Sequence, residues 1–135
     1  MRIIYTNLRV ANLEKSVEFY TKILGMQMHR QVENKEFCYS LVWLGFSDIG
    51  NDATAGIELI YNWDQSSYDL GSGFGQIVIG TEDVYKTCED IKAKGWTFTR
   101  EAGPVKGGQS IIAFLEDPDG YRIEFVEMPK QNQIF

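Results

Sequence analysis

Two glutamates stand at matching places in an internal repeat, and they are the side chains best suited to chemistry. Glu58 lies in GIELIY, residues 56–61, and Glu124 lies in YRIEFVE, residues 121–127. Each carboxylate is flanked by β-branched and large apolar residues, where a charge is costly unless it has a partner. Two carboxylates at equivalent places could hold a divalent cation or transfer protons.

Alternation along the strands indicates which side chains share a face with the glutamates. Side chains point alternately to the two faces of a strand, so Tyr5, Asn7 and Arg9 share one face of the first predicted strand. If the strands of both halves curve around a cleft, one oxygen-rich set would meet there: Tyr5, Glu58, Gln76 and Glu124. The alternative is that each glutamate lies on a solvated edge of its sheet.

The elements that would position these side chains repeat along the chain. Each half begins with a strand, residues 3–10 and 76–80, continues into an amphipathic helix and ends with further strands. Each helix is bounded by an expected N-cap and a glycine: Asn12 and Gly25, then Asp83 and Gly95. Each half therefore reads β-α-β-β-β, and the predicted fold class is α+β with two βαβββ modules in one chain.

These modules set the predicted domain organisation. Residues 1–128 are expected to form one domain made of modules 1–63 and 74–128, joined by a linker at 64–73 that is rich in Ser, Gly and Asp. Residues 129–135 are expected to be a tail. Each module is small for a domain that is stable alone, so we expect each to need a partner for its sheet.

Composition excludes several classes of partner. The chain has 135 residues, of which 44% are hydrophobic, a net charge of −6 and a pI of about 4.8. An acidic chain without a basic run is poorly suited to nucleic acid or to an anionic membrane. The N-terminus carries Arg2 and Arg9 and no long apolar segment, so we expect no signal peptide, no membrane span and a cytoplasmic protein.

Cysteine and histidine usage excludes the common zinc and iron sites. Cys38 and Cys88 fall in a predicted strand and helix, and we interpret both as small buried side chains in a reducing compartment. His29 is the only histidine. One histidine and two separated cysteines do not make a Cys/His zinc site, and an iron site with two histidines is excluded as well.

Five stretches of the chain resemble glyoxalase I (lactoylglutathione lyase) of the bacterial type, in the vicinal-oxygen-chelate superfamily. They are LRVANLEKSVEFYTKILGM at 8–26, IELIYNW at 57–63, YDLG at 68–71, TREAGPVKGG at 99–108 and AFLEDPDGYRIEFVE at 113–127. DPDGY is common across the superfamily, whereas REAGPVKGG together with ELIYNW is more specific to glyoxalase I. The resemblance implies the vicinal-oxygen-chelate, or glyoxalase, fold.

The resemblance also implies an activity, a cofactor and a set of site residues. The family isomerises the hemithioacetal of methylglyoxal and glutathione to S-lactoylglutathione, using a divalent metal (nickel, cobalt or zinc) and a carboxylate that moves the proton. The implied catalytic carboxylates are Glu58 and Glu124. The implied metal ligands fall on Tyr5, Glu58, Gln76 and Glu124. The implied contacts to the glutathione conjugate are Arg9, Asn62 and Lys106. The resemblance also implies that the protein forms a homodimer.

Two ligand positions depart from the family pattern and leave three functions open. Bacterial members usually carry histidine where this chain has Tyr5 and Gln76. An oxygen-only ligand set favours magnesium, manganese, calcium or no metal over nickel, cobalt and zinc. The first function is a glyoxalase I with an altered metal site. The second is a metal-free protein that binds a thiol conjugate or another small molecule. The third is a structural paralogue that pairs with an active homologue.

Overall fold

The computed structural model describes residues 1–47 and 55–129. The chain folds as two compact units, residues 1–69 and 70–135. The tail predicted from residue 129 lies outside the described residues from residue 130 onward. Within the described ranges, no helix has the length and apolar character needed to span a bilayer.

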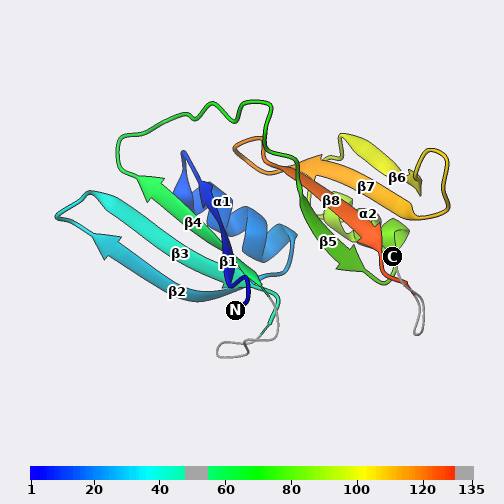
Figure 1. The fold of residues 1–135 in the computed structure, drawn as a ribbon, viewed down its shortest axis with the longest axis horizontal. Coiled ribbons are helices and arrows are strands. Elements are labelled where there is room, and N and C mark those ends of the chain that lie inside the picture. Colours follow the sequence, from blue (N-terminus) through cyan, green and yellow to red (C-terminus); the bar gives the residue numbers. More distant parts are fainter. Residues whose placement is uncertain (48–54, 130–135) are drawn as a thin grey trace. The chain divides into compact units, whose positions relative to one another are not determined.

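The first unit is built on one four-stranded mixed sheet. Its elements in chain order are β1 (Tyr5–Arg9), α1 (Leu13–Glu18), the π-helical turn η1 (Phe19–Ile23), β2 (Gln27–Asn34), β3 (Tyr39–Gly45) and β4 (Gly56–Asn62). The strand order is β1-β4-β3-β2, with the green β4 beside the dark blue β1 in Figure 1. The strand β4 pairs in parallel with β1 and antiparallel with β3.

The second unit repeats this topology. Its elements are β5 (Ile77–Thr81), α2 (Val84–Ala93), β6 (Arg100–Pro104), β7 (Ile111–Glu116) and β8 (Arg122–Glu127). The strand order is β5-β8-β7-β6, with β8 parallel to β5 and antiparallel to β7. The predicted α+β class with two βαβββ modules is therefore confirmed.

One face of each sheet is buried under the helix of the same unit. The helix α1 packs against β4, and α2 packs against β6, β7 and β8. Buried apolar side chains alternate along the strands with side chains of the other face, as the period of a half-buried strand requires. The buried apolar positions on these strands include Leu8, Val42, Leu44, Ile57 and Leu59, then Ala113, Leu115, Ile123 and Phe125. The faces away from the helices carry Glu58 and Glu124, and both glutamates are half-buried.

The predicted N-cap of the first helix is confirmed, but the helix does not continue regularly to its glycine. The Asn12 side-chain oxygen accepts a hydrogen bond from the Lys15 amide, 3.0 Å away. The α-helix then ends at Glu18 and a wider π-helical turn follows, closed by the Leu24 amide on the Phe19 carbonyl at 3.1 Å. A π turn inserts an extra residue into the helical repeat, which apolar spacing alone does not predict.

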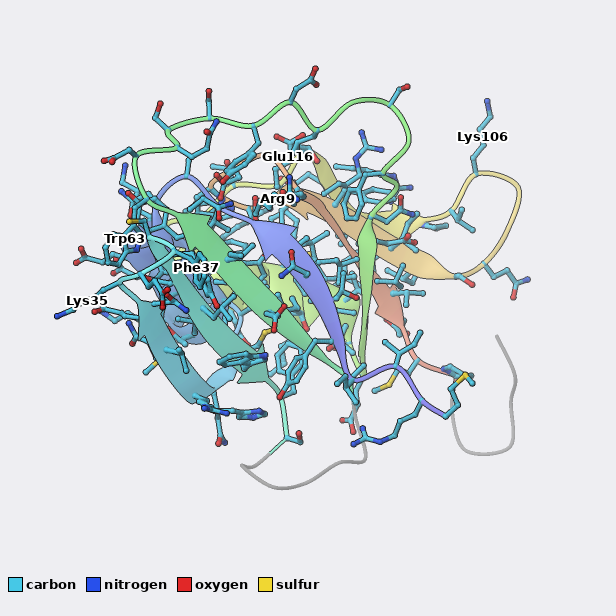
Figure 2. All side chains as sticks on the ribbon, turned by 60° about the vertical axis from the view of Figure 1, so that its left-hand side comes forward. Arg9, Lys35, Phe37, Trp63, Lys106 and Glu116 are labelled. Atoms are coloured by element: carbon cyan, nitrogen blue, oxygen red, sulfur yellow. The ribbon has the colours of Figure 1, made fainter. Side chains whose placement is uncertain are left out.

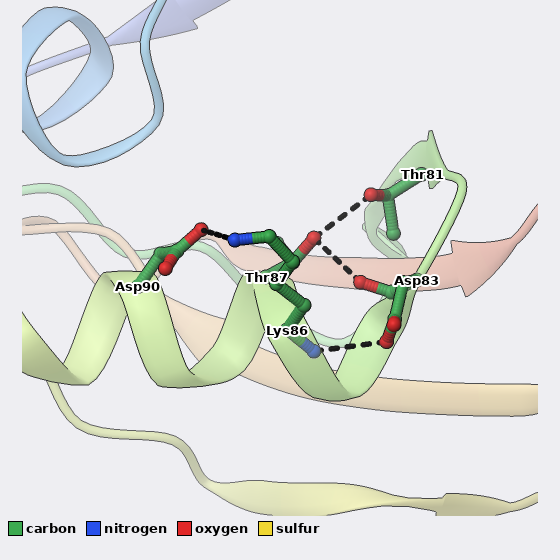
Figure 3. A network of polar contacts seen from close by, with 5 residues as sticks. All are labelled: Thr81, Asp83, Lys86, Thr87 and Asp90. Carbon is green, nitrogen blue, oxygen red and sulfur yellow. Dashed lines mark hydrogen bonds and ion pairs between the residues drawn. The ribbon is translucent and has the colours of Figure 1, made fainter.

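The second helix is tied at its start to the preceding strand. The Asp83 carboxylate caps α2 by accepting from the Lys86 amide at 2.9 Å, as predicted. The Thr87 hydroxyl donates to the Asp83 carbonyl at 2.8 Å and lies 2.8 Å from the Thr81 hydroxyl (Figure 3). Lys86 also pairs with Asp90, one turn further along the helix. This network fixes the end of β5 against α2.

A buried aspartate shapes the corner that leads into β8. Asp117 opens the DPDG turn and is only 4% exposed. Its carboxylate accepts hydrogen bonds from the backbone amides of Asp119 and Tyr121, both at 2.9 Å. These two bonds offset the cost of burying the charge. The corner thereby sets where β8 begins, and with it the position of Glu124.

The two cysteines differ, and the prediction that Cys38 is buried in a strand is wrong. Cys38 is exposed in the turn between β2 and β3, with a left-handed φ of 54°. The Asn34 side-chain oxygen accepts from the Phe37 amide at 2.9 Å and stabilises this turn, so turn chemistry outweighed the strand pattern. Cys88 is buried in α2, as expected.

The cysteines should therefore react with alkylating reagents at very different rates. Burial raises the pKa of the Cys88 thiol, and the thiolate is the reactive form. We expect iodoacetamide at neutral pH to modify Cys38 in the native protein and Cys88 only after denaturation. Peptide mass mapping with and without denaturant measures this. Equal labelling of both thiols in the native state would contradict the placement of Cys88.

Candidate functional site

The first cluster of polar and aromatic side chains surrounds Glu58 on the face of the sheet away from α1. The strand register places Asn7 of β1 on one side of Glu58 and Trp43 of β3 on the other. The Asn7 side-chain amide donates a hydrogen bond from Nδ2 to Oε1 of Glu58 at 2.7 Å. We call Tyr5, Asn7, Trp43, Gly56 and Glu58 the first carboxylate cluster.

Tyr5 makes aromatic contacts in this cluster. Its ring meets the Trp43 ring edge-on, with the ring centroids 6.5 Å apart. The same ring lies over Gly56, where a Cβ atom would come within 2.8 Å of Tyr5 Cε1. On the far side of Trp43, the Arg30 guanidinium lies 5.5 Å from the ring centroid, a distance typical of a cation–π contact.

The second cluster surrounds Glu124 in the same topological position of the other unit. Gln76, just before β5, donates a hydrogen bond from Nε2 to Oε2 of Glu124 at 2.9 Å. Val78 and Phe114 flank Glu124 on the neighbouring strands. The Arg122 guanidinium lies 5.8 Å from the Phe114 ring centroid. We call Gln76, Val78, Phe114, Arg122 and Glu124 the second carboxylate cluster.

The two clusters share a chemical plan. In each, a carboxylate on an inner strand accepts a hydrogen bond from a side-chain amide and has an aromatic ring on the adjacent antiparallel strand. Hydrogen bonds to a charged acceptor are stronger than neutral ones. Of the four residues expected to meet, Gln76 and Glu124 are in contact within the second unit. The meeting of Tyr5 and Glu58 with Gln76 and Glu124 in one site stays a prediction.

The side chains that most often bind metals, those of His, Cys, Asp and Glu, are not grouped together in the described residues. Among residues 1–47 and 55–129, no group of three or more His, Cys, Asp and Glu side chains lies close enough to hold a metal ion. The donors available in the clusters are two carboxylates and two amides, with the Tyr5 phenol on the ring that contacts Trp43. Oxygen donors of this kind suit hard divalent cations such as magnesium and manganese.

The residues expected to contact a glutathione conjugate lie at three different places. Arg9 ends β1 on the same face as Glu58 and is exposed. Asn62 ends β4, and its side-chain amide donates to the Tyr68 hydroxyl at 3.2 Å. Lys106 is exposed in the loop between β6 and β7, and its side chain extends away from the ribbon (Figure 2). Their role in binding stays a prediction.

A groove in the first unit lies on the opposite side of its sheet from Glu58. It is a wide groove of about 880 Å³ beside α1 whose lining includes Val17, Ser40 and Trp63. Ser40 alternates with the side chains of the Glu58 face, so the groove and the carboxylate are separated by the sheet. A smaller pocket of about 340 Å³ in the second unit includes Arg122 in its lining and adjoins the second cluster.

Sequence reasoning missed two members of the first cluster, Asn7 and Trp43. Strand alternation placed Asn7 on the correct face, but only the parallel register of β1 and β4 sets it opposite Glu58. Trp43 stands in the SLVWLG segment of the repeat, and its place beside Glu58 depends on the β3–β4 register. Knowing both registers in advance would have identified both residues.

Comparison with known proteins identifies the family. Residues 2–125 match the model of the Glyoxalase/Bleomycin resistance protein/Dioxygenase superfamily. The chain is 54% identical over 126 residues to a probable lactoylglutathione lyase of Vibrio parahaemolyticus, covering 93% of this chain and 90% of that one. It is 51% identical over 127 residues to a lactoylglutathione lyase of Haemophilus influenzae, covering 94% and 93%.

A solved structure agrees with these sequence matches. The crystal structure of glyoxalase I from Zea mays superposes with a TM-score of 0.88 at 39% identity, covering 96% of this chain and 46% of the maize chain. The chain thus spans about half the length of the maize protein. By fold and sequence it belongs to the Glyoxalase/Bleomycin resistance protein/Dioxygenase superfamily. Within that superfamily it is a glyoxalase I-like protein, so the resemblance seen in its motifs is confirmed.

Gly56 should be required for the close packing beneath Tyr5. A Cβ atom at Gly56 would lie 2.4 Å from the Leu44 carbonyl oxygen, which is backbone and has little freedom to move. We expect Gly56→Ala to lower the free energy of unfolding by about 1–3 kcal/mol. Gly103→Ala in β6 is the matched control, because a Cβ atom there would meet no described atom within 4 Å apart from its chain neighbours. Urea unfolding of both variants measures the difference, and equal midpoints would refute the close approach.

Proposed function

We propose that this protein isomerises the hemithioacetal of methylglyoxal and glutathione to S-lactoylglutathione. The observation that carries this proposal is the identity of about half the residues, over nearly the whole chain, with proteins named lactoylglutathione lyase. The pair of carboxylates on equivalent strands supports it further, because the reaction needs a base that moves a proton from one carbon to the adjacent carbon. These relatives favour a catalyst over a metal-free binding protein.

Glu58 and Glu124 are the reactive carboxylates in this proposal. One of them takes the proton from the carbon that bears sulfur and hydroxyl, which leaves an enediolate. The same carboxylic acid then returns the proton to the adjacent carbon, the former ketone carbon. The hydroxyl on the first carbon passes its proton to the former ketone oxygen and becomes the thioester carbonyl, so substrate and product contain the same atoms. The amides of Asn7 and Gln76 hold the carboxylates by the hydrogen bonds described above.

A divalent metal fits the donors of the two clusters. Glu58, Glu124 and Gln76 would hold it, with Tyr5 as the fourth predicted ligand. When bound, the cation supplies positive charge that stabilises the enediolate. Because all four donors are oxygens, magnesium or manganese should suit the site better than nickel, cobalt or zinc. Arg9 and Lys106 pair with the carboxylates of glutathione, and Asn62 offers its amide to the peptide part.

The working form in this proposal is a cytoplasmic homodimer. Both cysteines are unpaired thiols, which agrees with a reducing compartment. Glu58 belongs to the first unit and Glu124 to the second. In the dimer, each site combines the first module of one chain with the second module of its partner, so each module gains the partner for its sheet that its small size calls for.

Removing either carboxylate should abolish most of the isomerase activity. After dialysis against a chelator, the protein is reloaded separately with magnesium, manganese, nickel, cobalt or zinc, and thioester formation is followed with methylglyoxal and glutathione. We expect turnover with at least one metal, and a loss of about 100-fold or more in kcat for Glu58→Gln and for Glu124→Gln. Glu36→Gln, in the exposed β2–β3 turn, is the matched control and should retain full activity.

The same assay tests the ligand set and the alternative function. Tyr5→His with Gln76→His should raise nickel-dependent activity above either single variant, because ligands of one ion are strongly coupled. A folded wild-type protein that shows no turnover with any metal would overturn the proposed activity. Binding of S-lactoylglutathione without turnover would then favour the binding protein.

The shared site can be tested by mixing two inactive variants. We expect a mass of twice 15.4 kDa in analytical ultracentrifugation. When Glu58→Gln and Glu124→Gln chains are mixed and allowed to exchange, each mixed dimer contains one intact site and one doubly altered site. Random exchange should therefore restore about a quarter of wild-type activity. A monomeric mass, or a dimer whose mixed variants stay inactive, would reject a site built from two chains.

A further inference from the structure

The side chain on β1 that is hydrogen-bonded to Glu58 is Asn7. The two residues are register partners in the parallel β1–β4 ladder and point to the same face. Their side-chain contact is 2.7 Å between Nδ2 and Oε1, within the range of a charge-assisted hydrogen bond. β1 is an edge strand of its sheet, so Asn7 reaches inward from the edge to a carboxylate on the neighbouring strand.

Tyr5, two residues earlier on β1, is engaged differently. Its described contacts are with the Trp43 ring and with the backbone surface at Gly56. Among the described residues, its hydroxyl has no hydrogen-bond partner. On this strand, therefore, the amide of Asn7 and not the phenol of Tyr5 orients Glu58.

The second module also has a side-chain amide that is hydrogen-bonded to its glutamate. Gln76 precedes β5, the counterpart of β1, and its amide donates to Glu124 at 2.9 Å. The donors occupy different positions along the two strands, since Asn7 is opposite Glu58 whereas Val78 is opposite Glu124. An amide nevertheless reaches the carboxylate of an inner strand in both modules. The same amide–carboxylate contact is thus made from different strand positions in the two modules. This indicates that the contact has a role at the carboxylates.

We propose that Asn7 is a positioning residue that holds the Glu58 carboxylate in its working orientation, as Gln76 does for Glu124. This inference rests on the proposed function, in which Glu58 is a reactive carboxylate. The donor fixes one carboxylate oxygen and leaves the second oxygen for the substrate or a cation. Groups that orient a ligating or reacting carboxylate in this way commonly affect activity by about 10–100-fold.

Two substitutions that roughly keep the size of Asn7 distinguish a positioning role from a structural one. Asn7→Leu removes the donor, and we expect kcat to fall by about 10–100-fold with KM within about twofold of wild type, since the contact orients a reacting group. Asn7→Asp should fall further, because two like charges opposite each other in a sheet repel. Thr6→Val, on the other face of the same strand, is the control and should leave both constants unchanged.

An activity-independent measurement checks the contact itself. In nuclear magnetic resonance spectra of the full-length protein, Glu58→Gln should shift the side-chain amide resonances of Asn7, whereas Glu124→Gln should shift those of Gln76 instead. Asn7 resonances that are unaffected by Glu58→Gln, or an Asn7→Leu variant with wild-type kcat, would overturn the inference.

The outcomes also separate the inference from the proposed function. If the wild-type protein turns over no substrate with any metal, the proposed function fails, and the Asn7 inference is decided by the amide resonances alone. If the protein is active and Asn7→Leu is as active as Thr6→Val, the positioning role fails while the proposed function stands.

Discussion

The parallel pairing of the first and last strands of each module is the constraint on which the site depends. It makes β4 and β8 inner strands, each with a parallel neighbour on one side and an antiparallel neighbour on the other. Any side chain on the face away from the helix is then flanked by residues of two adjacent strands. Glu58 and Glu124 occupy this position in the two modules. The same pairing brings an amide from the start of the module to a carboxylate near its end.

The helices make this pairing possible by burying the opposite face. A parallel connection requires a crossover, and α1 and α2 lie in the segments that lead from the first strand of each module to the next. Capping by Asn12 and Asp83 fixes where each helix begins. Apolar side chains such as Leu59 and Ile123 are fully buried beneath them. The buried apolar side chains of each module thus lie mainly on the face of the sheet that the helix covers. The other face can therefore carry charged side chains.

On that second face, the surroundings of the carboxylates are partly apolar. Trp43 and Phe114 stand on the antiparallel side of the glutamates, and an arginine lies over each ring. The amides of Asn7 and Gln76 are the polar partners of the two carboxylates in these surroundings. Among the described residues, the polar side chains that meet in the two clusters are a carboxylate and an amide in each.

The sequence by itself determined the modules, the helix starts, the two key glutamates and the family. Turn residues, caps and alternation are local signals, and the repeat made Glu58 and Glu124 recognisable because they recur in the same context. Local signals were less reliable where two of them competed. The turn at Asn34 overrode the strand pattern at Cys38, and the π turn after Glu18 interrupted a regular apolar spacing.

Only the tertiary structure decided which polar side chain accompanies each carboxylate. Strand alternation shows which face a residue occupies, but the strand register shows which residue stands opposite it, and a register is set by pairing between segments about 50 residues apart. Asn7, not Tyr5, is therefore the hydrogen-bonded partner of Glu58. Trp43 entered the cluster through the register of the neighbouring strands β3 and β4. Pairing between distant strands depends on the packing of the whole module, so no short stretch of the sequence encodes it.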